Sequence, residues 1–95
     1  MLTNDINKGC IVVSSSGRDK GKYFFVLDLL SEDYVLIVDG KFRCIEKPKK
    51  KKIKHIKFYA PNNNQKFLDK IKNGIKLENA EIKKALNQFL TEEVL

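Results

Sequence analysis

The chain has few of the residues that usually build metal centres, disulfide frameworks and catalytic sites. It contains two cysteines, one histidine, two prolines and no tryptophan among 95 residues. Cys10 and Cys44 stand alone, without the spacing of metal ligands, so we expect two free thiols, with a bridge between them as the alternative. His55 has no serine or cysteine placed with it in a recognisable motif. We therefore expect no catalytic residue, no metal and no cofactor, and we predict that the chain is not an enzyme and takes no small-molecule substrate.

Long apolar runs are also missing. No segment approaches the ~18 consecutive apolar residues that span a bilayer, and the polar residues 1–8 do not resemble a secretory signal. Gly17 and Gly21 lie between two predicted strands, which excludes the strand, glycine loop and helix pattern of nucleotide-binding sites. With 42% hydrophobic and 33% charged residues, the composition is typical of a globular protein. We expect one cytoplasmic domain that makes no membrane contact.

What the chain does have is a concentrated positive charge. The formal net charge is +7, and residues 41–60 carry nine Lys or Arg against one acid, Glu46. The rest of the chain is therefore close to neutral. A concentrated block of one sign indicates a binding surface for a polyanion. The alternatives are a solvated lysine loop that keeps the protein soluble and a localisation signal.

Short apolar runs separated by turn residues predict a mainly β fold up to residue 58. The expected strands are 9–15, 23–30, 34–38, 42–46 and a short fifth segment with Ile53, Ile56 and Phe58. Asp39-Gly40 predicts a tight hairpin into the fourth strand, and Pro48 interrupts pairing after it. Residues 23–30 are apolar on both faces, which favours a small curled barrel with one face inside and the other sheltered by a helix.

Residues 59–95 are predicted to form a linker and helices that pack on this barrel within a single domain. The linker is Pro61 to Asn64, and Phe67, Leu68 and Ile71 predict a short helix that ends at Asn73-Gly74. Asn79 is the expected N-cap of a second helix, with an apolar stripe at helical spacing. The stripe comprises Ile82, Ala85, Leu86, Phe89 and Leu90. Docking of this helix on a partner is the alternative.

The segment Ser16-Gly17-Arg18-Asp19-Lys20-Gly21-Lys22 joins the first two predicted strands. Its two glycines permit a tight, irregular loop. The loop carries three cations, Arg18, Lys20 and Lys22, and we expect it also to expose backbone amides, because both kinds of group donate to phosphate oxygens. An ordinary charged hairpin loop is the alternative.

Aromatic side chains are interleaved with the cations of the basic block. They are Phe42, His55, Phe58 and Tyr59. Exposed rings stack on unpaired bases. We expect Phe42 and Phe58 to pack in the core, whereas stacking and packing both stay open for His55 and Tyr59. Since most of the cations are lysines, we expect a bound nucleic acid to be recognised mainly by its shape and backbone.

Several of these features, in this order, resemble a KOW motif. They are Gly9, the apolar run after it, the Ser16 to Lys22 loop, Val26 and the Asp39-Gly40 turn. The motif occurs in ribosomal proteins and transcription elongation factors, on a small SH3-like barrel. Phe24 stands where the bacterial ribosomal and elongation-factor members usually have another glycine. The continuation through Lys49 to His55 and the helix from Asn79 resemble the fourteen-e branch of large-subunit ribosomal proteins.

The resemblance implies an SH3-like barrel over residues 1–58 that binds structured, ribosomal RNA as a ribosomal or ribosome-associated protein, with ribosomal proteins as further partners. The expected RNA-binding residues are Ser16, Gly17, Arg18, Lys20, Gly21, Lys22, Arg43, Lys47, Lys49, Lys50, Lys51, Lys52, Lys54 and His55. One alternative function is a protein-interaction module of a transcription or translation complex, which docks through the barrel or the last helix. Another is general binding to DNA or anionic surfaces through charge alone.

Overall fold

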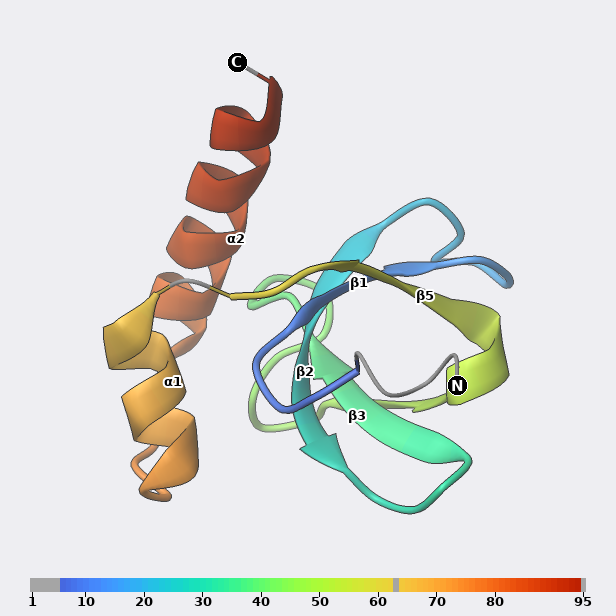
Figure 1. The fold of residues 1–95 in the computed structure, drawn as a ribbon, viewed down its shortest axis with the longest axis horizontal. Helices are drawn as coiled ribbons and strands as arrows, with labels where there is room; N and C mark the ends of the chain where they lie inside the picture. The colour runs from blue at the N-terminus through green and yellow to red at the C-terminus, as the bar shows by residue number, and fades with distance from the viewer. Residues whose placement is uncertain (1–5, 63, 95) are drawn as a thin grey trace.

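The computed structural model describes residues 6–62 and 64–94, which form a five-stranded sheet and two helices (Figure 1). Asn63 of the predicted linker lies outside the described residues. In chain order the elements are β1 (Ile11–Ser14), β2 (Tyr23–Leu29), β3 (Tyr34–Val38), β4 (Lys49–Lys52), the 3-10 helix η2 (Ile53–His55), β5 (Ile56–Ala60), α1 (Gln65–Lys72) and α2 (Asn79–Val94). The prediction of a mainly β chain with helices after it is confirmed.

The strands pair antiparallel in the order β4-β3-β2-β1-β5. The two outer strands, β4 and β5, follow each other in the chain and are connected by η2. Among the described residues no ladder joins these two strands, so the hydrogen-bonded sheet is open, whereas the sequence predicted a barrel. The loops at the ends of the strands are therefore held to one another by side-chain contacts and by single backbone hydrogen bonds, not by a continuous ladder.

Strand β2 is buried on both faces, as its double apolar pattern predicts. Phe24 and Val26 belong to one core cluster with Val12, Val35, Ile37 and Ile56. Phe25 faces the opposite side and joins a second cluster with Ile11, Val38 and residues of both helices. Helices α1 and α2 lie together on that side of the sheet (Figure 1). The helices thus cover an apolar face that would otherwise contact water.

The two helices begin and pack largely as the pattern predicts. Asn64 caps α1, because its Oδ1 accepts a hydrogen bond from the Phe67 amide at 3.1 Å. The helix ends before Asn73 and Gly74. In α2 the apolar stripe faces the sheet: Ile82 and Leu86 are buried in the second core cluster, and Ala85, Phe89 and Leu90 pack against it.

Asn79 is not the N-cap of α2, which corrects the prediction. Its side chain instead contacts the loop between β3 and β4: Oδ1 accepts from the Ile45 amide at 2.7 Å, and Nδ2 donates to the Glu46 carboxylate at 2.8 Å. The Asn79 hydrogen bond lowers the pKa of Glu46. At the start of α2, Glu81 accepts from the Glu78 amide at 2.9 Å, and this bond lowers the pKa of Glu81.

The predicted fourth strand at 42–46 and its tight hairpin are wrong. The Asp39 carboxylate accepts hydrogen bonds from the amides of Lys41, Phe42 and Arg43, at 2.8 to 3.0 Å. An amide held in this way is not available to a strand ladder. The chain therefore continues as a loop through Pro48, and the fourth strand is the lysine run itself, paired from Lys49 opposite Ile37 to Lys52 opposite Tyr34.

Gly40 fits where the β3–β4 loop meets α2, and we predict that Gly40→Ala is strongly destabilising. Its φ is +80°, and a Cβ there would collide with the Asn79 carbonyl and lie 2.8 Å from the Lys83 amide nitrogen. Gly74→Ala is the matched control, because its φ is +70° but a Cβ would meet nothing within 4 Å. Backbone strain alone should lower the free energy of unfolding of the control by about 1–2 kcal/mol. Gly40→Ala should lose at least about 1 kcal/mol more, because backbone of α2 must move; equal losses in urea unfolding would contradict this packing.

Candidate nucleic-acid interface

The loop between β1 and β2, residues 15–22, is a compact turn closed by its own backbone. The Gly21 amide donates to the Ser14 carbonyl at 2.8 Å, the Lys20 amide to Gly17 at 3.2 Å and the Lys22 amide to Asp19 at 2.9 Å. Gly17 and Gly21 have φ of +79° and +85° and are exposed. The glycines therefore shape the loop as predicted. The expectation that the loop exposes its amides is wrong for Lys20, Gly21 and Lys22, whose N–H groups are used within the protein.

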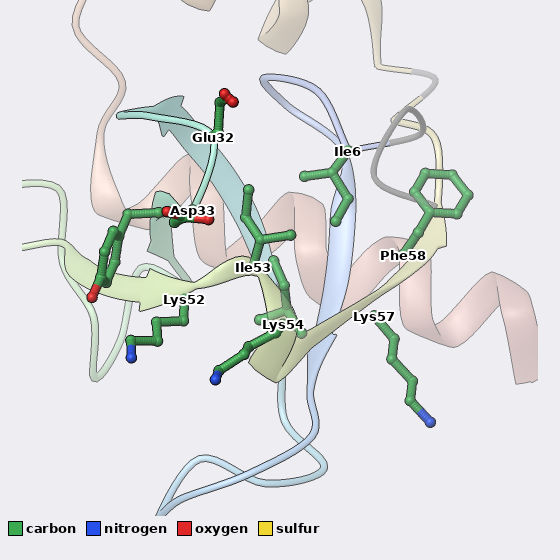
Figure 2. A pocket seen from close by; sticks show the side chains of 10 residues that line it. Ile6, Glu32, Asp33, Lys52, Ile53, Lys54, Lys57 and Phe58 are labelled. Carbon is green, nitrogen blue, oxygen red and sulfur yellow. The ribbon is translucent and has the colours of Figure 1, made fainter. Parts of the chain in front are cut away.

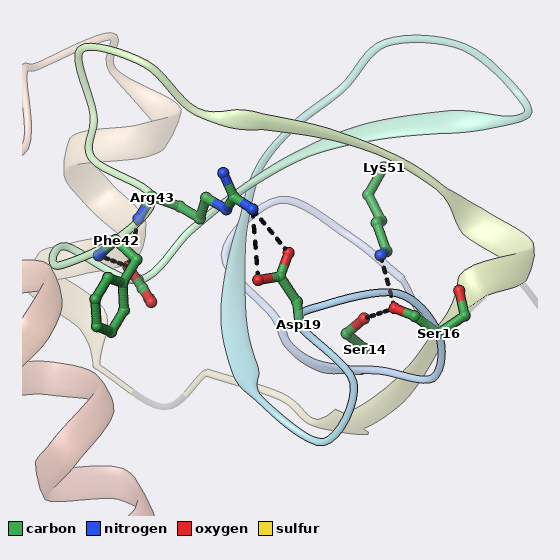
Figure 3. A network of polar contacts seen from close by, with 7 residues as sticks. Ser14, Ser16, Asp19, Phe42, Arg43 and Lys51 are labelled. Carbon is green, nitrogen blue, oxygen red and sulfur yellow. Dashed lines mark hydrogen bonds and ion pairs between the residues drawn. The ribbon is translucent and has the colours of Figure 1, made fainter.

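Three contacts fasten this loop to the basic segment, and Figure 3 shows the two that Lys51 and Arg43 make. The Ser15 amide donates to the His55 carbonyl of η2 at 2.8 Å. The Lys51 ammonium on β4 donates to the Ser16 carbonyl at 3.1 Å. The guanidinium of Arg43, on the β3–β4 loop, pairs with the Asp19 carboxylate at 3.1 Å. Segments 24 to 40 residues apart in the sequence thus meet around one loop.

Two of the predicted phosphate contacts are internal anchors. Lys51 lies opposite the buried Val35 on the inner face of β4 and is itself buried, with 8% of its surface exposed. Its aliphatic stem is enclosed while its ammonium reaches the Ser16 carbonyl, which accepts from one of the three N–H donors. Arg43 is half-buried and bound to Asp19, whose side chain is only 10% exposed. Both cations therefore have partners within the protein, Ser16 for Lys51 and Asp19 for Arg43.

The other predicted cations remain available on the surface. Arg18, Lys20 and Lys22 of the loop are exposed, as are Lys47, Lys50, Lys52 and Lys54. Lys49 and His55 are half-buried, as is Ser16. On β4 the exposed and enclosed lysines alternate because strand side chains point to opposite faces in turn. The period of the strand therefore divides the lysine run into Lys50 and Lys52, which face solvent, and Lys49 and Lys51, which face inwards.

The aromatic side chains differ from the prediction at Phe42 and Phe58. Phe42 is 65% exposed, and the ammonium groups of Lys22 and Lys41 lie 4.9 and 5.0 Å from its ring centroid. Phe58 is 37% exposed. Tyr59 packs against the rings of Tyr23 and Phe89, at centroid distances of 4.7 and 6.0 Å. Packing thus accounts for Tyr59, while Phe42 is a ring among cations at the surface.

A groove of about 780 Å³ opens beside η2 (Figure 2). Its apolar lining includes Ile6, Ile53 and Phe58. Three lysines line it as well, Lys52, Lys54 and Lys57, but so do the acids Glu32 and Asp33. In Figure 2 the ammonium groups of the lysines lie across the groove from Glu32. Because the acids repel phosphate, the groove is a poorer site for a polyanion than the loop.

The chain matches no protein-family model and is significantly similar to no curated protein. None of the described helices is long and apolar enough to cross a bilayer. Within residues 6–62 and 64–94 no group of three or more His, Cys, Asp or Glu side chains is placed to hold a metal. Cys10 and Cys44 are not joined by a disulfide, as predicted. Any functional conclusion depends on the arrangement of the chain's own residues.

Sequence reasoning counted Lys41 in the basic block and expected Phe42 in the core, but it missed the ion pair of Asp19 and the exposure of Phe42 beside Lys41. Asp19 is the acid inside the Gly17 to Gly21 segment, and an acid between cations could have indicated an ion pair. Lys41 and Phe42 directly follow the Asp39-Gly40 turn. The prediction of a strand there placed Phe42 on a core face, and only the Asp39 hydrogen bonds to the following amides show that the segment is a loop.

The Asp19–Arg43 pair should stabilise the protein more than a fully exposed ion pair does. We predict that a double-mutant cycle of Asp19→Asn and Arg43→Gln gives a coupling free energy of roughly 1–2 kcal/mol, because contacting partners that are partly buried usually couple in this range. Lys8–Asp28 is the control pair, at 3.5 Å and with both side chains about half exposed. Its cycle should give about 0.5 kcal/mol or less. Equal couplings, measured by urea unfolding, would show that the buried pair does not hold the loop.

Proposed function

We propose that the chain is an RNA-binding protein that binds structured RNA through the β1–β2 loop and the surrounding lysines. The observation that carries the proposal is that the loop is fastened at three points while Arg18, Lys20 and Lys22 stay exposed. A fixed loop presents its cations without a large loss of conformational entropy on binding. Bound phosphate groups attract the neighbouring cations, which otherwise repel one another. The counterions condensed on the RNA are released at the same time.

Ribosomal RNA is the RNA that we propose, in the cytoplasm, with ribosomal proteins as neighbours. The support is the resemblance of the Ser16 to Lys22 loop and its flanking residues to a KOW motif. The motif's SH3-like barrel is part of the same proposal. In its favour, the outer strands β4 and β5 are joined by the single turn of η2, and the Ser15–His55 hydrogen bond brings that turn to the β1–β2 loop.

The structure modifies which residues are proposed to contact RNA. Arg18, Lys20 and Lys22 are the primary phosphate contacts, and Lys50, Lys52 and Lys54 extend the charged surface. Lys51 and Arg43 hold the loop in place from inside. No enzymatic activity is part of the proposal.

The proposal predicts a salt-dependent affinity that depends on the loop. If about five phosphates are neutralised, the logarithm of the association constant should fall with the logarithm of salt concentration at a slope of roughly −3 to −5. The double variant Arg18→Gln/Lys20→Gln should bind a structured ribosomal RNA fragment more weakly and reduce the slope by about 2, because each lost phosphate contact removes about 1. Fluorescence anisotropy at several salt concentrations measures both effects.

The control variant is Lys66→Gln/Lys72→Gln, which removes the same charge from exposed positions on α1. Helix α1 lies away from the β1–β2 loop (Figure 1). The control should keep the slope of the unmodified protein. If both double variants lose equal affinity, binding follows net charge alone and the loop is not the site. If duplex DNA binds as tightly as structured RNA, the protein is a general polyanion binder.

The groove beside η2 favours a second function, a protein-interaction module. Its lining combines apolar side chains with charges of both signs, which suits a peptide better than a phosphate backbone. We expect the protein to sediment with ribosomes and to be released when nuclease digests the RNA. Retention on the digested particles, with loss of retention in Phe58→Ala, would favour the protein-interaction function instead. The apolar stripe of α2 is used within the chain and is less suited to such docking.

A further inference from the structure

Phe42 is the most exposed of the large apolar side chains in the described residues, at 65%. Leaving a phenylalanine ring in water is unfavourable, because its apolar surface is not buried. Its neighbours on both sides in sequence are cations, Lys41 and Arg43. An exposed ring among cations is complementary to a ligand that is flat and anionic.

The backbone that carries this ring is held firmly. The Asp39 carboxylate accepts from the Phe42 amide at 3.0 Å and from the amides on either side of it. The Asp39 and Gly40 amides donate to the Arg43 carbonyl at 3.0 and 3.2 Å, which closes the turn. Asn79 of α2 holds the same loop at Ile45. The ring is therefore presented by a preorganised turn, and its exposure is not the result of a frayed segment.

Two ammonium groups lie beside the ring and come from different segments. Lys41 Nζ is 5.0 Å from the ring centroid, and Lys22 Nζ, from the end of the β1–β2 loop, is 4.9 Å from it. Both distances are within the range of cation–π attraction. A ring with two cations beside it combines a stacking surface for a base with charges for the phosphates next to that base. An apolar protein partner would have to desolvate both ammonium groups, which is unfavourable.

We propose that Phe42, with Lys22 and Lys41, is a stacking site for one unpaired nucleobase of the bound RNA. The inference rests on the proposed function and adds that the protein distinguishes RNA with an unpaired nucleotide from a continuous duplex. A base inside a duplex is already stacked on its neighbours, so only a bulged or looped base can reach the ring. At this position the proposal adds contact with a base to the expected recognition, which is mainly by shape and backbone.

The test uses three RNA hairpins that differ at one position of the stem: a bulged adenosine, an abasic bulge and no bulge. The full chain should bind the bulged hairpin roughly five- to a hundredfold more tightly than the other two, which is the usual contribution of one stacked base. Phe42→Ala should lose this preference and bind all three hairpins alike, with an unchanged salt slope. Because the ring is exposed, the variant should unfold at the same urea concentration as the unmodified chain.

Phe42→Trp supplies a direct signal, because the chain has no other tryptophan. The fluorescence of this variant should be quenched by the bulged hairpin and much less by the abasic one. Phe42→Trp should retain the preference for the bulged hairpin, whereas Phe42→Leu should lose that preference. Ile75→Ala is the control: it removes another exposed apolar side chain, on the segment between α1 and α2. This variant should keep the preference of the unmodified chain for the bulged hairpin.

The possible failures are distinct. If Phe42→Ala leaves the preference for the bulge intact, or weakens all three hairpins equally, the stacking site is refuted and RNA binding by the loop stands. If the unmodified chain binds none of the hairpins, both the stacking site and the proposed function are refuted. If Phe42→Ala has no effect on RNA but abolishes retention on nuclease-treated ribosomes, the ring is a protein contact and the stacking proposal is wrong.

Discussion

The β1–β2 loop keeps its place because it supplies hydrogen-bond acceptors to a segment with an excess of cations. The Asp19 carboxylate binds the guanidinium of Arg43, and the Ser16 carbonyl binds the ammonium of Lys51. Without these acceptors two cations would be enclosed with no compensating group, which is costly. The same contacts separate the cations into two sets, those that hold the loop and those that face solvent. The charge available to a ligand is therefore decided by a few acceptors and not by the number of lysines.

Burial of β2 on both faces determines how the rest of the surface is arranged. One face closes against the neighbouring strands, and the other is covered by α1 and α2. Because α2 must lie against this second face, its first turn reaches the β3–β4 loop, where Asn79 binds Ile45 and Glu46. Packing of α2 on the sheet thus fixes the position of the β3–β4 loop. Phe42 owes its position to this loop, and so to the packing of α2.

The sequence predicts the features that depend on neighbouring residues and misses those that depend on distant ones. Strands β2 and β3 and the short helix α1 have clear apolar patterns and local stop signals, and their positions could be predicted closely. The lysine run has no alternation of apolar and polar residues, so its strand could not be recognised; pairing with β3 provides it. Asn79 has the residue type of an N-cap, but a distant loop competes for its side chain. The loop cations could be predicted, whereas the burial of Lys51 depends on the strand opposite.

The lysines of β4 have a consequence for the sheet itself. An outer strand has unpaired N–H and C=O groups along one side, and these groups can pair with the same strand of another molecule. Such pairing would place the ammonium groups of two copies of Lys50 and Lys52 close together, and like charges across a strand pair are destabilising. The basic run therefore protects the exposed edge from growth into aggregates, and concentrated salt weakens this protection by screening the charges.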